Sequence, residues 1–208
     1  PPALNVSAYS PENNSRLIDI GFKGNKYPLF IGDIERSNLI DYFTRNSSAH
    51  NLVVDVQYKR IVKEEWSGFL NKCKAIIGGE AGTYYLEKDD RTEKKINSYL
   101  KDNCDASYEE IHTNFFLNRK KNRSGKAISS RHFEAIGTKT CQILLEGGYN
   151  NILLKDVHYI PVKKDLSDVE EAIQKYKDVD YRNSIIENAY DYIISNHTYE
   201  YRIKELLD

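Results

Sequence analysis

The chain has 208 residues, with 30 lysines and arginines against 31 aspartates and glutamates, so its formal net charge is -1. This balance argues against a dedicated nucleic-acid-binding domain, which is usually strongly basic, and we expect no nucleic-acid partner. A hydrophobic content of 40% excludes a disordered chain, and no apolar run reaches the roughly 18 residues that a membrane span needs.

The start of the chain and its cysteines bear on its origin. The sequence opens with Pro1-Pro2 and contains no methionine, which indicates a piece of a longer protein. Residues 1–16 are rich in proline, asparagine and serine without periodicity and predict a linker. Three cysteines without paired spacing are typical of reduced thiols in a cytoplasmic protein.

Short apolar segments alternate with amphipathic ones along the rest of the chain. This alternation predicts an α/β fold of three layers, in which helices cover both faces of a parallel sheet. In chain order, we expect a strand at 17–22, a helix at 33–45, a strand at 51–56, a helix at 64–74, a strand at 75–77, helices at 89–101, 107–117 and 129–136, strands at 142–145 and 157–160, and helices at 169–177, 181–195 and 199–207.

The carboxyl ends of parallel strands are where ligands bind in such folds. We therefore expect functional residues just after each strand, in segments 23–36, 78–82, 137–142, 146–150 and 163–168.

Basic residues follow the first predicted strand. Lys23 and Lys26 flank Gly24, and Arg36 lies on the next helix. Glycine lets a backbone approach a phosphate, and a helix N-terminus adds positive potential. The spacing is neither a P-loop nor a dinucleotide fingerprint, so a solvated basic surface is the alternative to a phosphate site.

A glycine-rich turn follows the third predicted strand. Gly78-Gly79-Glu80-Ala81-Gly82 places one carboxylate among three glycines. Such a turn can approach a ligand closely, or it can be a simple turn with an exposed glutamate.

The segment 129–138 places a carboxylate on an apolar helix. Glu134 lies beside Phe133, Ala135 and Ile136, and burying it unpaired would cost several kcal/mol. It therefore needs either a ligand or a structural partner, and Arg131 is the candidate partner. Gly137 ends the helix, and Thr138 offers a hydroxyl group.

Residues 83–126 form the irregular part of the chain and end in the basic loop 119–126. We expect this loop to be mobile, either as a solvated loop or as a contact for an acceptor or an anionic membrane surface. The histidines and cysteines show no metal-ligand spacing, so no metal site is expected.

Several of these segments resemble one enzyme family. IGGEAG at 77–82, SSRHFEAIGTKTCQILLEG at 129–147 and HYIPVKKDLSDVEEAI at 158–173 are similar to the CgeB-like glycosyltransferases, which are related to the retaining family 4 enzymes of GT-B fold. DIGFKGNKYP at 19–28 resembles the first strand of that family's C-terminal lobe, and HTYEYRIKELL at 197–207 resembles its closing helix.

The resemblance implies a domain organisation and an activity. Residues 17–208 would form the C-terminal, nucleotide-sugar-binding lobe of a GT-B glycosyltransferase, a Rossmann-like lobe with an insertion at 83–126 and a closing helix at 199–207. The enzyme would transfer a sugar from a nucleotide-diphosphate donor to a glycan, lipid or protein acceptor in glycan biosynthesis, with retention and without a cofactor. An N-terminal lobe would be its partner, and the closing helix would reach away from this lobe.

The resemblance also implies roles for individual residues. Glu134 matches the glutamate that binds the ribose hydroxyls of the donor. In the family, an earlier glutamate faces the donor sugar, and seven residues separate it from the ribose-binding glutamate. In this chain the corresponding position, eight before Glu134, is Lys126. We therefore expect Glu80, on the other side of the insertion, to take this catalytic role. The expected donor-binding set is completed by Lys23, Lys26, Arg36, Gly79, Gly82, Arg131, Gly137 and Thr138.

Two other functions stay open at this point. The chain could be a binding or scaffold module that holds a nucleotide without chemistry, or part of a GT-B sugar epimerase. An isolated lobe could also bind the donor and transfer nothing. The expected location is the cytoplasm, including a peripheral position at the inner face of the membrane.

Overall fold

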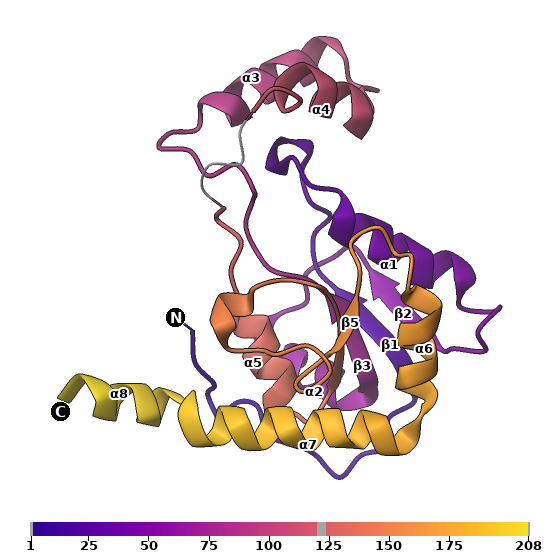
Figure 1. Ribbon diagram of the computed structural model, residues 1–208, viewed down its shortest axis with the longest axis vertical. Coiled ribbons are helices and arrows are strands. Elements are labelled where there is room, and N and C mark those ends of the chain that lie inside the picture. The colour runs from indigo at the N-terminus through magenta and orange to yellow at the C-terminus, as the bar shows by residue number, and fades with distance from the viewer. Residues whose placement is uncertain (1, 120–123, 208) are drawn as a thin grey trace.

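The computed structural model describes residues 2–119 and 124–207 and contains one five-stranded parallel sheet (Figure 1). The sheet order is β2-β1-β3-β4-β5, and every neighbouring pair is parallel. The strands are β1 (Ile18–Lys23), β2 (Val54–Gln57), β3 (Cys73–Gly78), β4 (Cys141–Leu145) and β5 (Ile160–Val162). This confirms the predicted α/β lobe with a parallel sheet.

The boundaries of some elements differ from the expected ones. Helix α2 (Lys63–Lys72) stops two residues early because β3 begins at Cys73. Strand β5 begins at Ile160 rather than 157, because the chain turns at Asp156, whose φ is 57°. Local apolar runs predict that a strand exists more reliably than where it starts.

Two hydrophobic clusters lie on opposite faces of the sheet. One contains side chains of α1 (Glu35–Asn46) and α6 (Val169–Lys177). The other contains side chains of α2, α5 (Ser130–Gly137) and α7 (Val179–Asn196). Side chains alternate along each strand, so one sheet supplies both clusters and the lobe has three layers.

The N-terminal segment packs on the lobe instead of forming the expected linker. Leu4 is 1% exposed and joins the cluster beneath α5 and α7. Its amide donates to the carbonyl of His197 at 2.8 Å, and its carbonyl accepts from the amide of Tyr199 at 3.1 Å. A few apolar side chains thus anchor a segment whose composition alone is typical of a linker.

Most of the insertion forms a small helical unit away from the sheet (Figure 1). The helical cap consists of α3 (Arg91–Asp102), α4 (Tyr108–Phe115) and the short helix η1 (Leu29–Ile31). Ile96, Ile111 and Phe116 are buried at its centre, and Leu29 and Phe30 of η1 pack against them. The insertion therefore completes its core with the loop that follows β1.

A narrow ribbon joins the helical cap to the lobe. Ala81 and Ala127 exchange backbone hydrogen bonds of 2.9 and 3.0 Å, and the amide of Gly125 donates to the carbonyl of Thr83 at 2.8 Å. Gly82 has a φ of +91°, and a Cβ atom there would overlap the carbonyl oxygen of Gly125. The ribbon thus requires glycine at position 82.

We expect Gly82→Ala to lower the free energy of unfolding by about 1–3 kcal/mol, because alanine is strained at this φ and crowds the facing strand. Gly68→Ala is the matched control, since an added Cβ on this residue of α2 meets nothing within 4 Å. The control should raise the stability by about 0.5–1 kcal/mol. Urea unfolding measures both, and equal stability of the two variants would contradict the account of the ribbon.

The last helix, α8 (Tyr199–Leu207), buries none of its residues and extends past the end of α7 (Figure 1). Ile203, Leu206 and Leu207 are 55%, 85% and 81% exposed. The expectation that the closing helix reaches away from the lobe is confirmed. Across the described residues, none of the helices has the length and apolar character to cross a membrane.

Candidate functional site

A cavity of about 530 Å³ lies where β1 and β3 end. The loop after β1 lines it from Lys23 to Pro28, and the turn after β3 lines it with Gly78, Gly79, Ala81 and Gly82. The start of α5 forms another wall with Ser130 and Arg131. Segments 23–36 and 78–82 therefore meet here, as the parallel topology predicts, and segment 137–142 adds Gln142 to the lining. Segments 146–150 and 163–168 lie outside this cavity.

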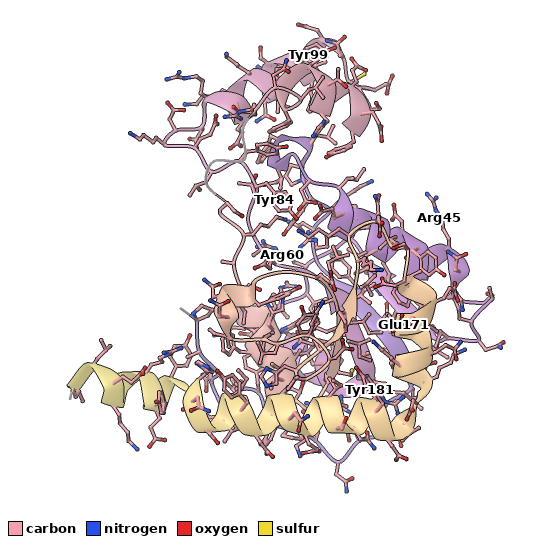
Figure 2. The ribbon with its side chains drawn as sticks, viewed as in Figure 1. Arg45, Arg60, Tyr84, Tyr99, Glu171 and Tyr181 are labelled. Atoms are coloured by element: carbon pink, nitrogen blue, oxygen red, sulfur yellow. The ribbon has the colours of Figure 1, made fainter. Side chains whose placement is uncertain are left out.

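The lining of the cavity is strongly cationic. Among the described residues no aspartate or glutamate lines it. In the view of Figure 2, Arg60 lies between the helical cap and α5. The cationic side chains of the lining are Lys23, Lys26, Arg36, Arg60 and Arg131.

Lys23 is neutralised by a neighbour. Its ammonium lies 2.9 Å from a carboxylate oxygen of Asp55 and 4.7 Å from the centre of the Phe69 ring. The side chain is only 9% exposed. Lys23 thus lines the cavity, as expected, but its charge already has a partner.

Among the described residues, neither Arg36 nor Arg131 forms an ion pair with an acid. Arg36 lies over Tyr27, with 3.3 Å from its guanidinium carbon to the ring centre, and donates to the carbonyl of Asn25 at 3.0 Å. Burial lowers the pKa of Arg36, and the nearby charge of Arg131 lowers it further. Burial likewise lowers the pKa of Arg131; the nearby carboxylate of Glu134 raises it in part, and the charge of Arg60 lowers it. Like charges that are held together and form no ion pair with an acid among the described residues favour the binding of an anion.

The two rim cations complete the set. Lys26 and Arg60 are exposed, and no ion pair joins either of them to an acid among residues 2–119 and 124–207. The sequence analysis singled out Lys26 but missed Arg60, which lies in a loop without a glycine signal. Four cations around the cavity are therefore available to a ligand.

Glu134 lies just outside the cavity wall. Its Oε2 atom accepts a hydrogen bond of 2.7 Å from the indole N–H of Trp66, which lines the cavity. Within the described residues no ion pair joins Glu134 to Arg131, so Trp66 rather than Arg131 is the structural partner of the carboxylate. The ribose-binding role of Glu134 stays a prediction.

The carboxylate of Glu80 turns away from the cavity. Its Oε1 atom accepts from the amide of Tyr149 at 2.7 Å, and the side chain packs against Gly147, where a Cβ atom would lie 2.6 Å from Oε2. Glu80 therefore holds the loop after β4, while its neighbours Gly79 and Gly82 line the cavity. Its catalytic role stays a prediction.

Gly137 and Thr138 are not part of this site. Thr138 is fully buried, and its hydroxyl donates to the carbonyl of Ala135 at 3.0 Å. A Cβ atom on Gly137 would lie 2.5 Å from Leu4. The expectation that both bind the donor is wrong, because α5 starts at the cavity and carries its last turn into the core beside the N-terminal segment.

His132 fixes the start of α5. The amide of Ser129 donates to Nδ1 of His132 at 3.0 Å, and the two side chains form a capping box. His132 is 5% exposed, and burial lowers its pKa to about 4. The imidazole is therefore neutral at pH 7 and acts as a structural cap, a role that the sequence analysis did not assign.

This burial predicts a pH dependence of stability. Between pH 6.5 and about 4 the unfolded chain binds a proton at His132 and the folded chain does not. Stability should therefore fall by about 3 kcal/mol as the pH drops through this window. Glutamine can retain the capping box, so His132→Gln should flatten the profile, as measured by urea unfolding at several pH values. Parallel profiles for the two proteins would show that His132 is not buried as a neutral group.

Lys126 anchors the base of the helical cap. Its ammonium pairs with Oδ2 of Asp33, and the two side chains are 8% and 1% exposed. The other oxygen, Oδ1, accepts from the amide of Glu35 at the start of α1 at 2.8 Å. Residues 120–123 of the basic loop lie outside the described residues. In the part of the chain that is described, no group of three or more His, Cys, Asp or Glu is placed to hold a metal ion.

Comparisons with known proteins show what the sequence and the fold of the chain are similar to. Residues 106–208, just under half of the chain, match a family described as glycosyl transferase-like. No curated protein matches the chain. The sucrose-phosphate synthase of Thermosynechococcus elongatus is similar in structure, with 11% identity and a TM-score of 0.53 over 100% of this chain and 51% of that one.

Two further solved structures are similar at lower scores. The C-terminal domain of a glycosyl transferase group 1 family protein (LpcC) from Francisella tularensis has 11% identity and a TM-score of 0.49 over 94% of this chain and 99% of that one. An α,α-trehalose 6-phosphate synthase from Burkholderia multivorans has 12% identity and a TM-score of 0.42 over 92% of this chain and 42% of that one.

The likeness to the sucrose-phosphate synthase, at 11% identity, shows the fold alone, and the chain spans about half the length of that protein. Residues 106–208 are similar in sequence to the glycosyl transferase-like family, and the whole chain has a Rossmann-like α/β lobe that is similar in fold to the sucrose-phosphate synthase.

Proposed function

We propose that the chain is the donor-binding lobe of a glycosyltransferase and that its cavity holds the diphosphate of a nucleotide-sugar. The observation that carries the proposal is a set of four cations around one cavity that form no ion pair with an acid among the described residues. They are Lys26, Arg36, Arg60 and Arg131.

The chemistry of sugar transfer fits this arrangement. As the bond to the sugar breaks, negative charge develops on the departing diphosphate. Arg36 is held by Tyr27 and the carbonyl of Asn25, so little reorganisation is needed to place its donors. The first turn of α5 adds backbone N–H groups and the positive end of a helix dipole. These groups would stabilise the leaving group.

The carboxylates have separate proposed roles. Glu134 would accept hydrogen bonds from the ribose hydroxyls through Oε1, while Trp66 holds Oε2. Glu80 would face the donor sugar from the turn after β3. Because its Oε1 atom now accepts from the amide of Tyr149, this role requires the loop after β4 to rearrange when the donor binds.

The rest of the proposal concerns partners and location. Transfer would need an N-terminal lobe that brings the acceptor, a glycan, lipid or protein, to the cavity. The same proposal places the chain in the CgeB-like family, with transfer that retains the configuration of the sugar. It also places the protein in the cytoplasm, at the inner face of the membrane. These assignments agree with the resemblance of segments 129–147 and 158–173.

A thermal-shift screen of UDP, GDP, ADP, CMP and dTDP and their sugars tests the proposal. A ligand present at 100 times its dissociation constant should add about 2.7 kcal/mol of stability. We expect one nucleoside series to stabilise the chain. No stabilisation by any series would favour a scaffold module, whereas conversion of the stabilising nucleotide-sugar to its epimer without an acceptor would favour an epimerase.

A further inference from the structure

Trp66 is the one tryptophan of the chain, and it lies outside the segment that matches the glycosyl transferase-like family. It lines the cavity from α2 and is 7% exposed. Its ring stacks on Phe69 at 5.5 Å between centres and 26° between planes, and its N–H donates to Glu134. The indole is therefore fixed on one face and at its polar edge.

The guanidinium of Arg131 lies over this ring. Its central carbon is 4.6 Å from the ring centre of Trp66, and its Nη1 atom donates to the carbonyl of Lys23 at 2.6 Å. A Cβ atom on Gly24 would lie 3.3 Å from the same nitrogen, so glycine leaves room for the group. The ring of Trp66 and the carbonyl of Lys23 thus hold one flat cation in place at the cavity wall.

This cation offers a surface for a particular class of ligand. Arg131 lines the cavity, and no ion pair engages it within residues 2–119 and 124–207. A guanidinium plane binds the face of a π system, and nucleobases stack on arginine in this way. A sugar ring has no π face, so the surface favours the base of a nucleotide over its sugars.

We propose that Arg131 is the stacking surface for the nucleobase of the donor and that Trp66 is the positioning residue behind it. This inference rests on the proposed function and extends it, because it assigns the base to the wall formed by α2 and α5. Ser130, the neighbour of Arg131 at the start of α5, also lines the cavity.

The test compares two ligands that differ only in the base. Calorimetry gives the dissociation constants of a nucleoside diphosphate, chosen from the screen above, and of ribose 5-diphosphate. For the unchanged chain we expect the nucleoside diphosphate to bind about tenfold more tightly than ribose 5-diphosphate, because the stacking of one base contributes about this much to affinity. Arg131→Lys keeps the charge and removes the plane, so it should reduce this ratio to about twofold or less.

Trp66→Leu tests the positioning role, since it removes the ring beneath the guanidinium and leaves Arg131 in place. It should also reduce the ratio, and Arg45→Lys, on the exposed end of α1, should leave it unchanged. Melting temperatures confirm that each variant is folded. If Arg131→Lys left the ratio unchanged, the base subsite would be overturned. If Arg131→Lys reduced the ratio and Trp66→Leu did not, the positioning role of Trp66 would be overturned.

The outcomes also separate this inference from the proposed function. Equal affinity of the unchanged chain for the two compounds would overturn the base subsite and leave the diphosphate site intact. Absence of binding by both would overturn the proposed function and the subsite together.

Discussion

Replacing Arg36 with glutamine is expected to weaken the binding of a nucleoside diphosphate by about tenfold to a hundredfold. Hydrogen bonds to charged groups contribute about 1.5–3 kcal/mol each, and Arg36 is fixed against Tyr27 before a ligand arrives. Glutamine keeps a polar side chain of intermediate length and loses the charge. Calorimetric titration measures the effect.

A matched control lies on the same helix. Arg45 is exposed at the far end of α1, and Figure 2 shows it well away from Arg60. Arg45→Gln removes the same charge from the chain and should leave the dissociation constant unchanged. If both substitutions weakened binding equally, the effect would be one of overall charge and the cavity assignment would be contradicted.

The second large effect concerns stability. Lys126→Met should lower the free energy of unfolding by about 3–5 kcal/mol, because it leaves the carboxylate of Asp33 buried without its cation. The side chain of Asp33 is only 1% exposed, so water cannot take the place of the ammonium. Urea unfolding measures the loss.

A double variant separates the buried charge from the loss of packing. Asp33→Asn combined with Lys126→Met removes both charges and keeps an oxygen that can accept from the amide of Glu35. It should be more stable than Lys126→Met alone. Asp33→Asn alone is also measured. If the double variant lost as much stability, relative to the unchanged chain, as Asp33→Asn and Lys126→Met lose together, the two side chains would not act as a buried pair.

The fold was largely predictable because its signals are local. Apolar segments such as 142–145 alternate with amphipathic helices, and this alternation selects a parallel sheet. The same topology predicted that the loop after β1 and the turn after β3 would meet, and they line one cavity. The linker at 1–16 was not predicted correctly, because Leu4 and Tyr9 form a core contact with no periodic pattern.

The site was less predictable because its contacts join distant segments. Trp66 reads in the sequence as one apolar residue of an amphipathic helix, and only the structure shows that it binds Glu134, 68 positions away. Arg60 has no motif around it. Thr138 directly follows α5, whose first turn lines the cavity. The C-terminal end of the same helix lies in the core, so Thr138 is buried away from the cavity.

The central claim is that the cationic cavity is a nucleoside diphosphate site. A crystal structure of the chain with the nucleoside diphosphate that stabilises it most tests this claim directly. The account predicts the diphosphate within hydrogen-bond distance of Arg36 and the first turn of α5, with the base against Arg131. A bound nucleotide elsewhere on the surface, with this cavity left empty, would contradict it.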